Sequence, residues 1–368
     1  MREALRYFEE LSGRLVAGCR KAAQDGTTLY TPDGMGNYDA LWTRDFAYMA
    51  EYAPQFIPDG DLRRAIDYLL AGQRGDGWIP DRVYADGKIE YAAGGFPTYA
   101  GLANLDNGAF LAILAGLYCD RLPEAEGRAA FAAWEAALDR GLAVLPRAQD
   151  GLIYNDPVEI HSPYGFTDIV GKSGELFMES LLYWRGCRVL ATHSNSDTRA
   201  RHYARRAQAV EAGLDKLWSE EHGGFLAATG DCRQLDVWGN AYAIYIDFPL
   251  GEKRERILEM LMNNADRYLY RGQVRHLFRG EYWQRLLLPE AGPAEQYQNG
   301  AYWATATGWV MWAIAQRNRP LAERIAAEVL ADFQAHGAYE CINEGYAKLD
   351  TYVVSATNVY GALQRLID

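Results

Sequence analysis

Six short glycine-bearing segments divide the chain, and two long helical patterns occupy each interval. Each segment joins a glycine turn to a short β-like stretch; they are DGTTLYTP (25–32), GDGWIPD (75–81), DGLIYND (150–156), HGGFLAA (222–228), GQVRHLF (272–278) and GAYECIN (337–343). Six helical hairpins cannot each bury an apolar face alone, and closing them into a double ring solves this problem. The pattern therefore predicts an all-α fold, an (α/α)6 toroid barrel of six helical hairpins with short β-like loops at one end. We expect it to form a single domain over residues 1–368.

Apolar residues recur at helical spacing in the intervals, as Phe110, Leu111 and Leu114 do in LDNGAFLAILAGLYCDRL (105–122). The predicted helices cover 3–21, 40–53, 61–73, 104–120, 128–146, 170–191, 197–218, 236–247, 251–267, 300–315, 319–335 and 351–366. An open α-solenoid is the competing arrangement, but these loops are too unequal and too rich in Trp and carboxylates for a plain repeat scaffold. In a closed barrel the loops meet at one end, so their polar residues converge on one cavity.

Charge and composition exclude several classes of partner. The 368 residues are 49% apolar and carry a net charge of −12 without a basic run, so nucleic acid and anionic membranes are poor partners. Aromatic residues make up 13% of the chain, including 25 Tyr and 10 Trp. Such rings can stack on sugar faces while a polar tip hydrogen-bonds, and a large helical core is an equally good explanation for them.

The cysteines and histidines show no disulfide or metal-binding pattern. The five cysteines lack CxxC spacing, and the six histidines lack HxH and HExxH spacing, so we expect no metal ion and no cofactor. Residues 1–25 have the pattern of a charged amphipathic helix, and no apolar run is long enough to span a membrane. We therefore expect a cytoplasmic protein without a signal peptide. The sequence leaves its oligomeric state open.

The stretch ALWTRDFAYM (40–49) places a flat ring, a planar cation and a carboxylate within four positions, as Trp42, Arg44 and Asp45. One interpretation is an ion pair at a helix start, with Trp42 as a hydrophobic staple. The other is that Arg44 and Asp45 hydrogen-bond vicinal hydroxyls of a sugar, because guanidinium donates and carboxylate accepts, while Trp42 stacks on the ring.

This WxRD opening followed by a helix resembles the six-hairpin glycosidases, which include trehalases, processing α-glucosidases, glucoamylases and glycogen-debranching glucosidases. GDGWIPD (75–81) and NLDNGAFLAIL (104–114) are similar to further motifs of that superfamily. The strongest similarity lies in YGFTDIVGKSGELFMESLLYW (164–184), and later similarities are EQYQNGAYWATATGWVMWAI (295–314) and GAYECINEGYAKLDTYVVSATNVYGAL (337–363). The resemblance follows the same order over most of the chain.

The resemblance implies a glycoside hydrolase and assigns candidate catalytic residues. Relatives place a catalytic Asp in the loop before a helix like the one in 164–184, which implies that Asp168 is the general acid. The catalytic base lies in the closing loop of many relatives. Glu340 matches that position best, Glu344 is the second candidate, and Glu295 ranks third.

The chemistry of glycoside hydrolysis agrees with two such carboxyl groups. An inverting enzyme needs a protonated acid and, about 6.5–9.5 Å away, a carboxylate that activates water. Carboxyl groups from opposite sides of a barrel mouth can straddle one sugar ring. Burial beside Tyr164 and Phe166 would raise the pKa of Asp168, because desolvation disfavours the anion.

The remaining site candidates are the polar and aromatic side chains of the same motifs. Asp106 and Asn107 are also plausible helix caps. Glu175 stands where the relatives have an Asp-Leu-Asn trio, so it is a candidate to replace that trio or to bind the sugar as an additional ligand. We expect the sugar to be bound by Trp42, Arg44, Asp45, Trp78, Asp106, Asn107, Glu175, Gln298, Asn299 and Trp303.

The sequence thus predicts an inverting, exo-acting hydrolase of short oligosaccharides, with an α-glucoside as the default substrate by resemblance. Two alternatives stay open. A sugar epimerase or isomerase of the same barrel uses histidines for proton transfer, and His276 is the histidine to consider for that role. The other alternative is a carbohydrate-binding barrel without catalytic activity.

Overall fold

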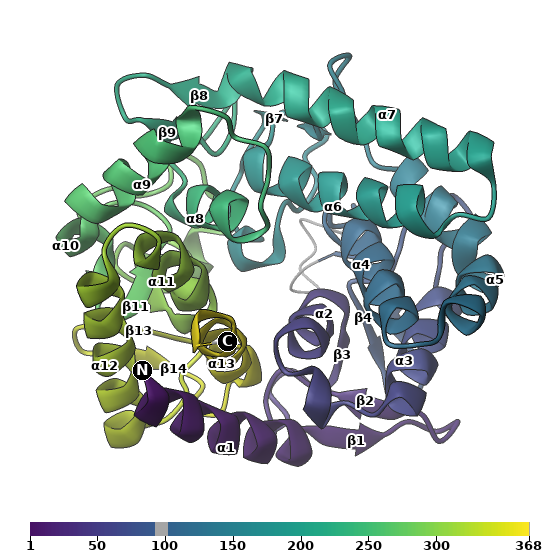
Figure 1. Cartoon of the computed structure of the whole chain (residues 1–368), viewed down its shortest axis with the longest axis horizontal. Helices are drawn as coiled ribbons and strands as arrows, with labels where there is room; N and C mark the ends of the chain where they lie inside the picture. The colour runs from purple at the N-terminus through teal and green to yellow at the C-terminus, as the bar shows by residue number, and fades with distance from the viewer. Residues whose placement is uncertain (93–101, 368) are drawn as a thin grey trace.

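The helices form two concentric rings (Figure 1). The computed structural model describes residues 1–92 and 102–367. The inner helices contact one another in the order α2, α4, α6, α8, α11 and α13, and α13 packs against α2 to close the ring. The outer helices surround this ring. This arrangement confirms the predicted (α/α)6 barrel.

The strongest contacts between the rings join α4 to α5, α6 to α7 and α11 to α12, each an inner helix and the outer helix that follows it, and join α13 to α1. The inner helices are α2 (Thr43–Tyr52), α4 (Asn107–Asp120), α6 (Phe177–His193), α8 (Val237–Tyr245), α11 (Thr307–Ala315) and α13 (Val353–Ile367). The outer helices are α1 (Arg2–Gly18), α3 (Asp59–Ala71), α5 (Glu124–Ala143), α7 (Asp197–Gly213), α9 (Lys253–Asn263) and α12 (Arg319–His336). The one-turn helix α10 (Ala265–Tyr268) follows α9.

The two rings differ in their sequence patterns because they differ in burial. In the outer helix α1, the buried residues Ala4, Phe8, Leu11 and Val16 recur at helical spacing, with exposed charged residues between them. In the inner helix α4, every residue from Asn107 through Gly116 is buried. A helix that is buried all round needs no polar face, so apolar periodicity is weak in α4.

Short antiparallel strands occupy the connections that lead from outer to inner helices. They are β1 (Arg20–Ala22), β2 (Thr28–Tyr30), β3 (Ala40–Trp42), β4 (Arg82–Tyr84), β5 (Ile89–Glu90), β6 (Tyr154–Asn155), β7 (Gly174–Glu175), β8 (Trp218–Ser219), β9 (Gly224–Phe225), β10 (Leu269–Tyr270), β11 (Gln273–Arg275), β12 (Tyr302–Trp303), β13 (Cys341–Asn343) and β14 (Tyr346–Lys348). The six glycine-bearing segments all fall in these connections. Strands β10 to β14 form one sheet that joins the connections before α11 and α13.

Three predicted helices were wrong at their N-terminal ends. The predictions over 40–53, 170–191 and 300–315 included residues that are extended, because the helices begin only at Thr43, Phe177 and Thr307. The extended residues pair across neighbouring connections; Trp42 lies opposite Arg82, and Tyr302 lies opposite Ile342. Tertiary pairing at the end of the barrel therefore overrides the local apolar spacing.

Aromatic side chains fill the axis of the barrel. The hydroxyl groups of Tyr48 and Tyr164 lie 2.7 Å apart, and Trp309 Nε1 donates to Tyr52 Oη at 2.8 Å. Deeper in the ring, Arg185 contacts Glu51 at 2.8 Å and the hydroxyl of Tyr242 at 2.7 Å. Much of the high aromatic content is therefore core packing, and these contacts close the axis at one end.

All five cysteines are buried free thiols. Within the described ranges, none of the helices combines the length and the apolar character that a bilayer crossing requires.

Substituting Gly361 should destabilise the barrel. A Cβ at this residue of α13 would lie 2.7 Å from the carbonyl oxygen of Tyr52 at the end of α2, so the helices would have to separate. We expect Gly361→Ala to lower the free energy of unfolding by about 1–3 kcal/mol, as overpacking does, measured by urea denaturation. The control is Gly60→Ala in α3, where nothing lies within 4 Å of the added Cβ; it should be neutral or slightly stabilising. Equal effects of the two substitutions would contradict this packing argument.

Candidate active site

One cavity lies at the end of the barrel where the outer-to-inner connections meet, and it has a volume of about 300 Å³. Its walls come from the connections before α2, α6, α11 and α13 and from the first turn of α2. Many of the lining side chains are aromatic: Tyr38, Trp42, Phe166, Tyr297, Trp303, Tyr346 and Tyr352. Three carboxyl groups also line it, those of Asp45, Asp168 and Glu340. Such a cavity offers apolar faces together with a few convergent polar groups.

Asp168 follows a single 3-10 turn, Gly165–Thr167, in the connection before α6, and is 9% exposed. Its Oδ1 accepts a hydrogen bond from Gln298 Nε2 at 2.7 Å. The other atom of that amide, Gln298 Oε1, accepts from the backbone N–H of Ile169 at 3.0 Å, so Gln298 fixes both the carboxyl group and its loop. Burial raises the pKa of Asp168 to about 7, although the Arg44 charge and the Gln298 hydrogen bond act in the opposite direction.

Glu340 stands immediately before β13 and is 2% exposed. Its Oε2 lies 2.9 Å from Lys348 Nζ, and its Oε1 accepts a hydrogen bond from the Tyr38 hydroxyl at 2.9 Å. Burial raises the pKa of Glu340, while the Lys348 ammonium and the Tyr38 hydroxyl lower it. The two carboxyl groups therefore share one cavity but have different partners: a neutral amide for Asp168 and a cation for Glu340.

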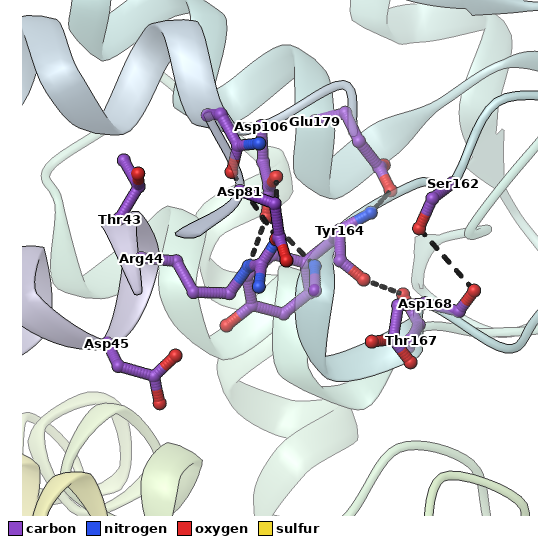
Figure 2. Close-up of polar contacts among 12 residues, drawn as sticks. Thr43, Arg44, Asp45, Asp81, Asp106, Ser162, Tyr164, Thr167, Asp168 and Glu179 are labelled. Carbon is purple, nitrogen blue, oxygen red and sulfur yellow. Dashed lines mark hydrogen bonds and ion pairs between the residues drawn. The ribbon is translucent and has the colours of Figure 1, made fainter. Parts of the chain in front are cut away.

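Arg44 forms the base on which the Asp168 loop rests. Its Nε lies 3.0 Å from Asp106 Oδ2 and its Nη2 lies 2.5 Å from Asp81 Oδ1 (Figure 2). Asp106 Oδ2 also accepts from the backbone N–H of Gly165 at 2.8 Å. A Cβ on Gly165 would lie only 1.8 Å from Arg44 Nε, so this position of the loop requires glycine. The guanidinium thus binds buried carboxylates of the protein, although Arg44 also reaches the cavity wall.

Asp45 points away from this ion-pair cluster (Figure 2). It is 3% exposed, and its Oδ1 accepts from the Tyr352 hydroxyl at 2.6 Å. Burial raises the pKa of Asp45 to about 7, against the effects of Arg44 and Tyr352. Adjacent residues of α2 therefore have different positions, since Arg44 supports the loop and Asp45 lines the cavity with Trp42.

Other predicted site residues lie behind the cavity wall, outside the residues that line it. Trp78 stacks on His161 with ring centroids 4.8 Å apart. The Asn107 amide lies between Asp106 and the backbone N–H of Asp81, beside the Arg44 ion pairs. Glu175 in β7 accepts a hydrogen bond from the Thr229 hydroxyl.

The remaining candidates support the connection before α11 or lie on the surface. Asn299 accepts from the backbone N–H of Trp283 and donates to the carbonyl of Gly292, both at 2.9 Å. Glu295 pairs with Arg275 at 3.1 Å. Glu344 is exposed in the turn between β13 and β14 and does not line the cavity.

The cavity residues that the sequence reasoning missed include Tyr38, Tyr297, Tyr346, Lys348 and Tyr352. A signal existed for Lys348, because ECINEGYAK (340–348) is a hairpin whose turn contains Gly345, at a φ of 71°. Folding that hairpin places Cys341 opposite Lys348 and so brings the lysine beside Glu340. The tyrosines carried no comparable signal in a chain so rich in aromatic residues.

The histidines lie outside the residues that line the cavity. His276 is buried against Trp238 with ring centroids 3.8 Å apart, and desolvation lowers its pKa well below the usual value. In the part of the chain that the structure describes, no group of three or more His, Cys, Asp and Glu side chains could hold a metal ion.

The chain is similar to known proteins in structure rather than in sequence. No protein-family model and no curated protein sequence matches it. By structure, it is similar to a rhamnosidase from Klebsiella oxytoca with rhamnose bound, at a TM-score of 0.68 and 14% identity, with 99% of this chain and 64% of the rhamnosidase covered. The chain therefore spans less than two thirds of that protein's length.

Two further solved structures match over nearly their full lengths. A GH63 mannosylglycerate hydrolase from Thermus thermophilus in complex with glucose has a TM-score of 0.65 and 16% identity, covering 96% of this chain and 99% of that one. A wild-type glycosidase has a TM-score of 0.64 and 16% identity, covering 99% of this chain and 97% of that one. The chain therefore has the (α/α)6-barrel fold of the six-hairpin glycosidases, the superfamily to which these neighbours belong.

Proposed function

We propose that this protein is a glycoside hydrolase that acts with inversion, with Asp168 as general acid and Glu340 as general base. One observation carries the proposal: two buried carboxyl groups line the same aromatic cavity, one hydrogen-bonded by the Gln298 amide and the other paired with the Lys348 ammonium. Burial raises the pKa of both groups, and the Lys348 ammonium opposes that effect most directly at Glu340.

The surroundings of each carboxyl group suit its proposed role. A general acid must hold a proton near neutral pH, and burial raises the pKa of Asp168 to about 7. A general base must be ionised, and Glu340 accepts hydrogen bonds from Tyr38 and pairs with Lys348. In the proposed reaction, Asp168 protonates the glycosidic oxygen as the bond to the anomeric carbon breaks. Glu340 takes a proton from the water that attacks the opposite face of the sugar.

The cavity also suits one sugar unit. The rings of Trp42, Tyr297 and Trp303 offer apolar faces, and the Asp45 carboxyl group can hydrogen-bond a sugar hydroxyl. Below the cavity, Phe166 packs against Tyr48 with ring centroids 6.0 Å apart, so the barrel axis is filled. A cavity closed in this way favours exo action on a terminal sugar.

The structural neighbours support a carbohydrate substrate, since one holds rhamnose and another glucose. The α-glucoside default rests on the sequence resemblance to trehalases and processing α-glucosidases.

A panel of disaccharides and aryl glycosides, read by sugar release and by NMR of the product anomers, tests the activity. We expect release of a monosaccharide whose first-formed anomer is opposite to that of the substrate. A product with retained configuration would contradict the assignment of Glu340 as a base. Sugar binding without release of sugar from any glycoside would instead favour a non-catalytic barrel.

The Asp168→Asn variant should lose activity in a manner that depends on the leaving group. We expect kcat for a glycoside with a poor leaving group to fall by about 10²–10⁴-fold, which is the usual contribution of general acid catalysis to the rate. A glycosyl fluoride needs little protonation at the leaving atom, so its turnover should fall much less. The control is Glu344→Gln, at an exposed carboxyl group outside the cavity, which should keep both rates. An equal loss on both substrates would show that Asp168 is not the acid.

The pH dependence of kcat/KM should be bell-shaped. Asp168 acts in its protonated form, so activity should fall as the pH rises through about 7. Glu340 acts in its ionised form, so activity should fall again at low pH. Because burial also brings the pKa of Asp45 to about 7, the variant Asp45→Asn is the control. It should turn over more slowly but keep the alkaline limb, whereas the residual activity of Asp168→Asn should lack it.

A further inference from the structure

Lys348 projects from β14 into the cavity, and its ammonium group makes three contacts. Its Nζ lies 2.9 Å from Glu340 Oε2, 2.9 Å from the Tyr38 hydroxyl oxygen and 3.7 Å from the centre of the Tyr297 ring. The side chain is 33% exposed, whereas that of Glu340 is 3% exposed. The cation therefore lies at the boundary between the buried carboxylate and the open part of the cavity.

The hairpin that carries Lys348 fixes this geometry. Cys341 and Lys348 are opposite each other in the β13–β14 register, and the backbone N–H of Glu340 donates to the Lys348 carbonyl at 2.9 Å. The acid and the cation thus come from adjacent strands whose spacing the backbone determines. The Tyr297 face and the Tyr38 hydroxyl then hold the flexible lysine stem in one orientation.

Several charged or titratable groups act on Glu340 from the elements packed around it. They are Lys348 and Tyr346 of β14, Cys341 of β13, Tyr38 and Asp33 of the connection before α2, Asp45 of α2, Tyr297 of the connection before α11, and Tyr352 before α13. Asp33 and Asp45 oppose a negative charge on Glu340. Among the described residues, Lys348 is the cation that forms an ion pair with Glu340.

We propose that Lys348 is a positioning residue that keeps Glu340 ionised and directs its carboxylate within the cavity, rather than a binding group for the substrate. This inference rests on the proposed role of Glu340 as the base. Burial and two nearby acids favour a protonated Glu340, which could not take a proton from water. The ammonium opposes both effects, since an opposite charge at this distance stabilises the ionised form. The Tyr38 hydroxyl donates to both carboxylate oxygens, at 2.9 and 3.1 Å, and so orients the group further.

The first test compares Lys348→Met with Lys348→Arg in the full chain. We expect Lys348→Met to move the acidic limb of the kcat/KM profile to higher pH by about one to three units, so that the bell narrows toward the alkaline limb near pH 7 and its maximum falls. Lys348→Arg should restore the position of the limb, because it keeps the charge. Lys216→Met removes an exposed lysine paired with Asp150 and should leave the profile unchanged. A rate loss that is the same at every pH, or an unmoved limb, would overturn the proposal.

A second measurement does not require turnover. The ¹³C-carboxyl NMR resonance that disappears in Glu340→Gln can be titrated with and without Lys348→Met. We expect the Glu340 midpoint to move to higher pH in Lys348→Met, and an unchanged midpoint would overturn the inference. A change confined to the KM of acidic glycosides would also overturn it, because that result identifies Lys348 as a substrate contact.

The outcomes separate this inference from the proposed function. If Glu340→Gln retains full activity, the proposed function fails whatever Lys348 does. If Glu340→Gln is inactive but Lys348→Met changes neither the pH profile nor the NMR titration, only the role of Lys348 fails.

Discussion

The buried ion pairs of Arg44 connect the parts of the protein that shape the cavity. One guanidinium, 2% exposed, contacts Asp106 before α4 and Asp81 before β4, and Asp106 also accepts the Gly165 N–H from the Asp168 loop. Charges removed from water are costly unless every partner is satisfied, and losing one member would leave the others buried and unpaired. The cluster therefore determines where the Asp168 loop can lie, and it does so from a residue of the inner ring. This explains why Arg44 stands between Trp42 and Asp45 in the sequence while its guanidinium pairs with carboxylates of the protein.

The rest of the site depends on a difference between two carboxyl groups in one cavity. Asp168 faces a neutral amide from Gln298, and Glu340 faces an ammonium from Lys348. Gln298 comes from a different connection than Asp168, whereas Lys348 belongs to the same hairpin connection as Glu340, so only the second environment is set locally. The ring of six inner helices supplies a common base, and the unequal connections at its end supply the asymmetry that the proposed acid–base chemistry needs.

The sequence predicted the barrel fold, while the roles assigned to the site residues stay predictions. Twelve periodic stretches and six glycine turns imply the barrel, because hairpins of this length must share a core. Residues 40–42, 174–175 and 302–303 were misjudged as helical since their strand pairing depends on distant partners. Arg44 lines the cavity and stays a predicted sugar ligand, but its ion pairs with Asp81 and Asp106 join positions 37 and 62 residues apart and were not foreseen. The place of Lys348 beside Glu340 could be inferred from the register of the β13–β14 hairpin. The contacts of Tyr38 and Tyr297 with Lys348 join connections far apart in the sequence, so the sequence alone did not reveal them.

The contact of Arg185 with Glu51 and Tyr242 has a consequence for the order of events in a hydrolase of this shape. These side chains and the aromatic rings above them fill the barrel axis, so a ligand of the cavity enters and leaves through the same opening. In the proposed reaction, a sugar bound at the bottom of the cavity would leave only after the fragment cleaved from it has left the opening. The free sugar at high concentration would then compete with incoming substrate for the empty protein.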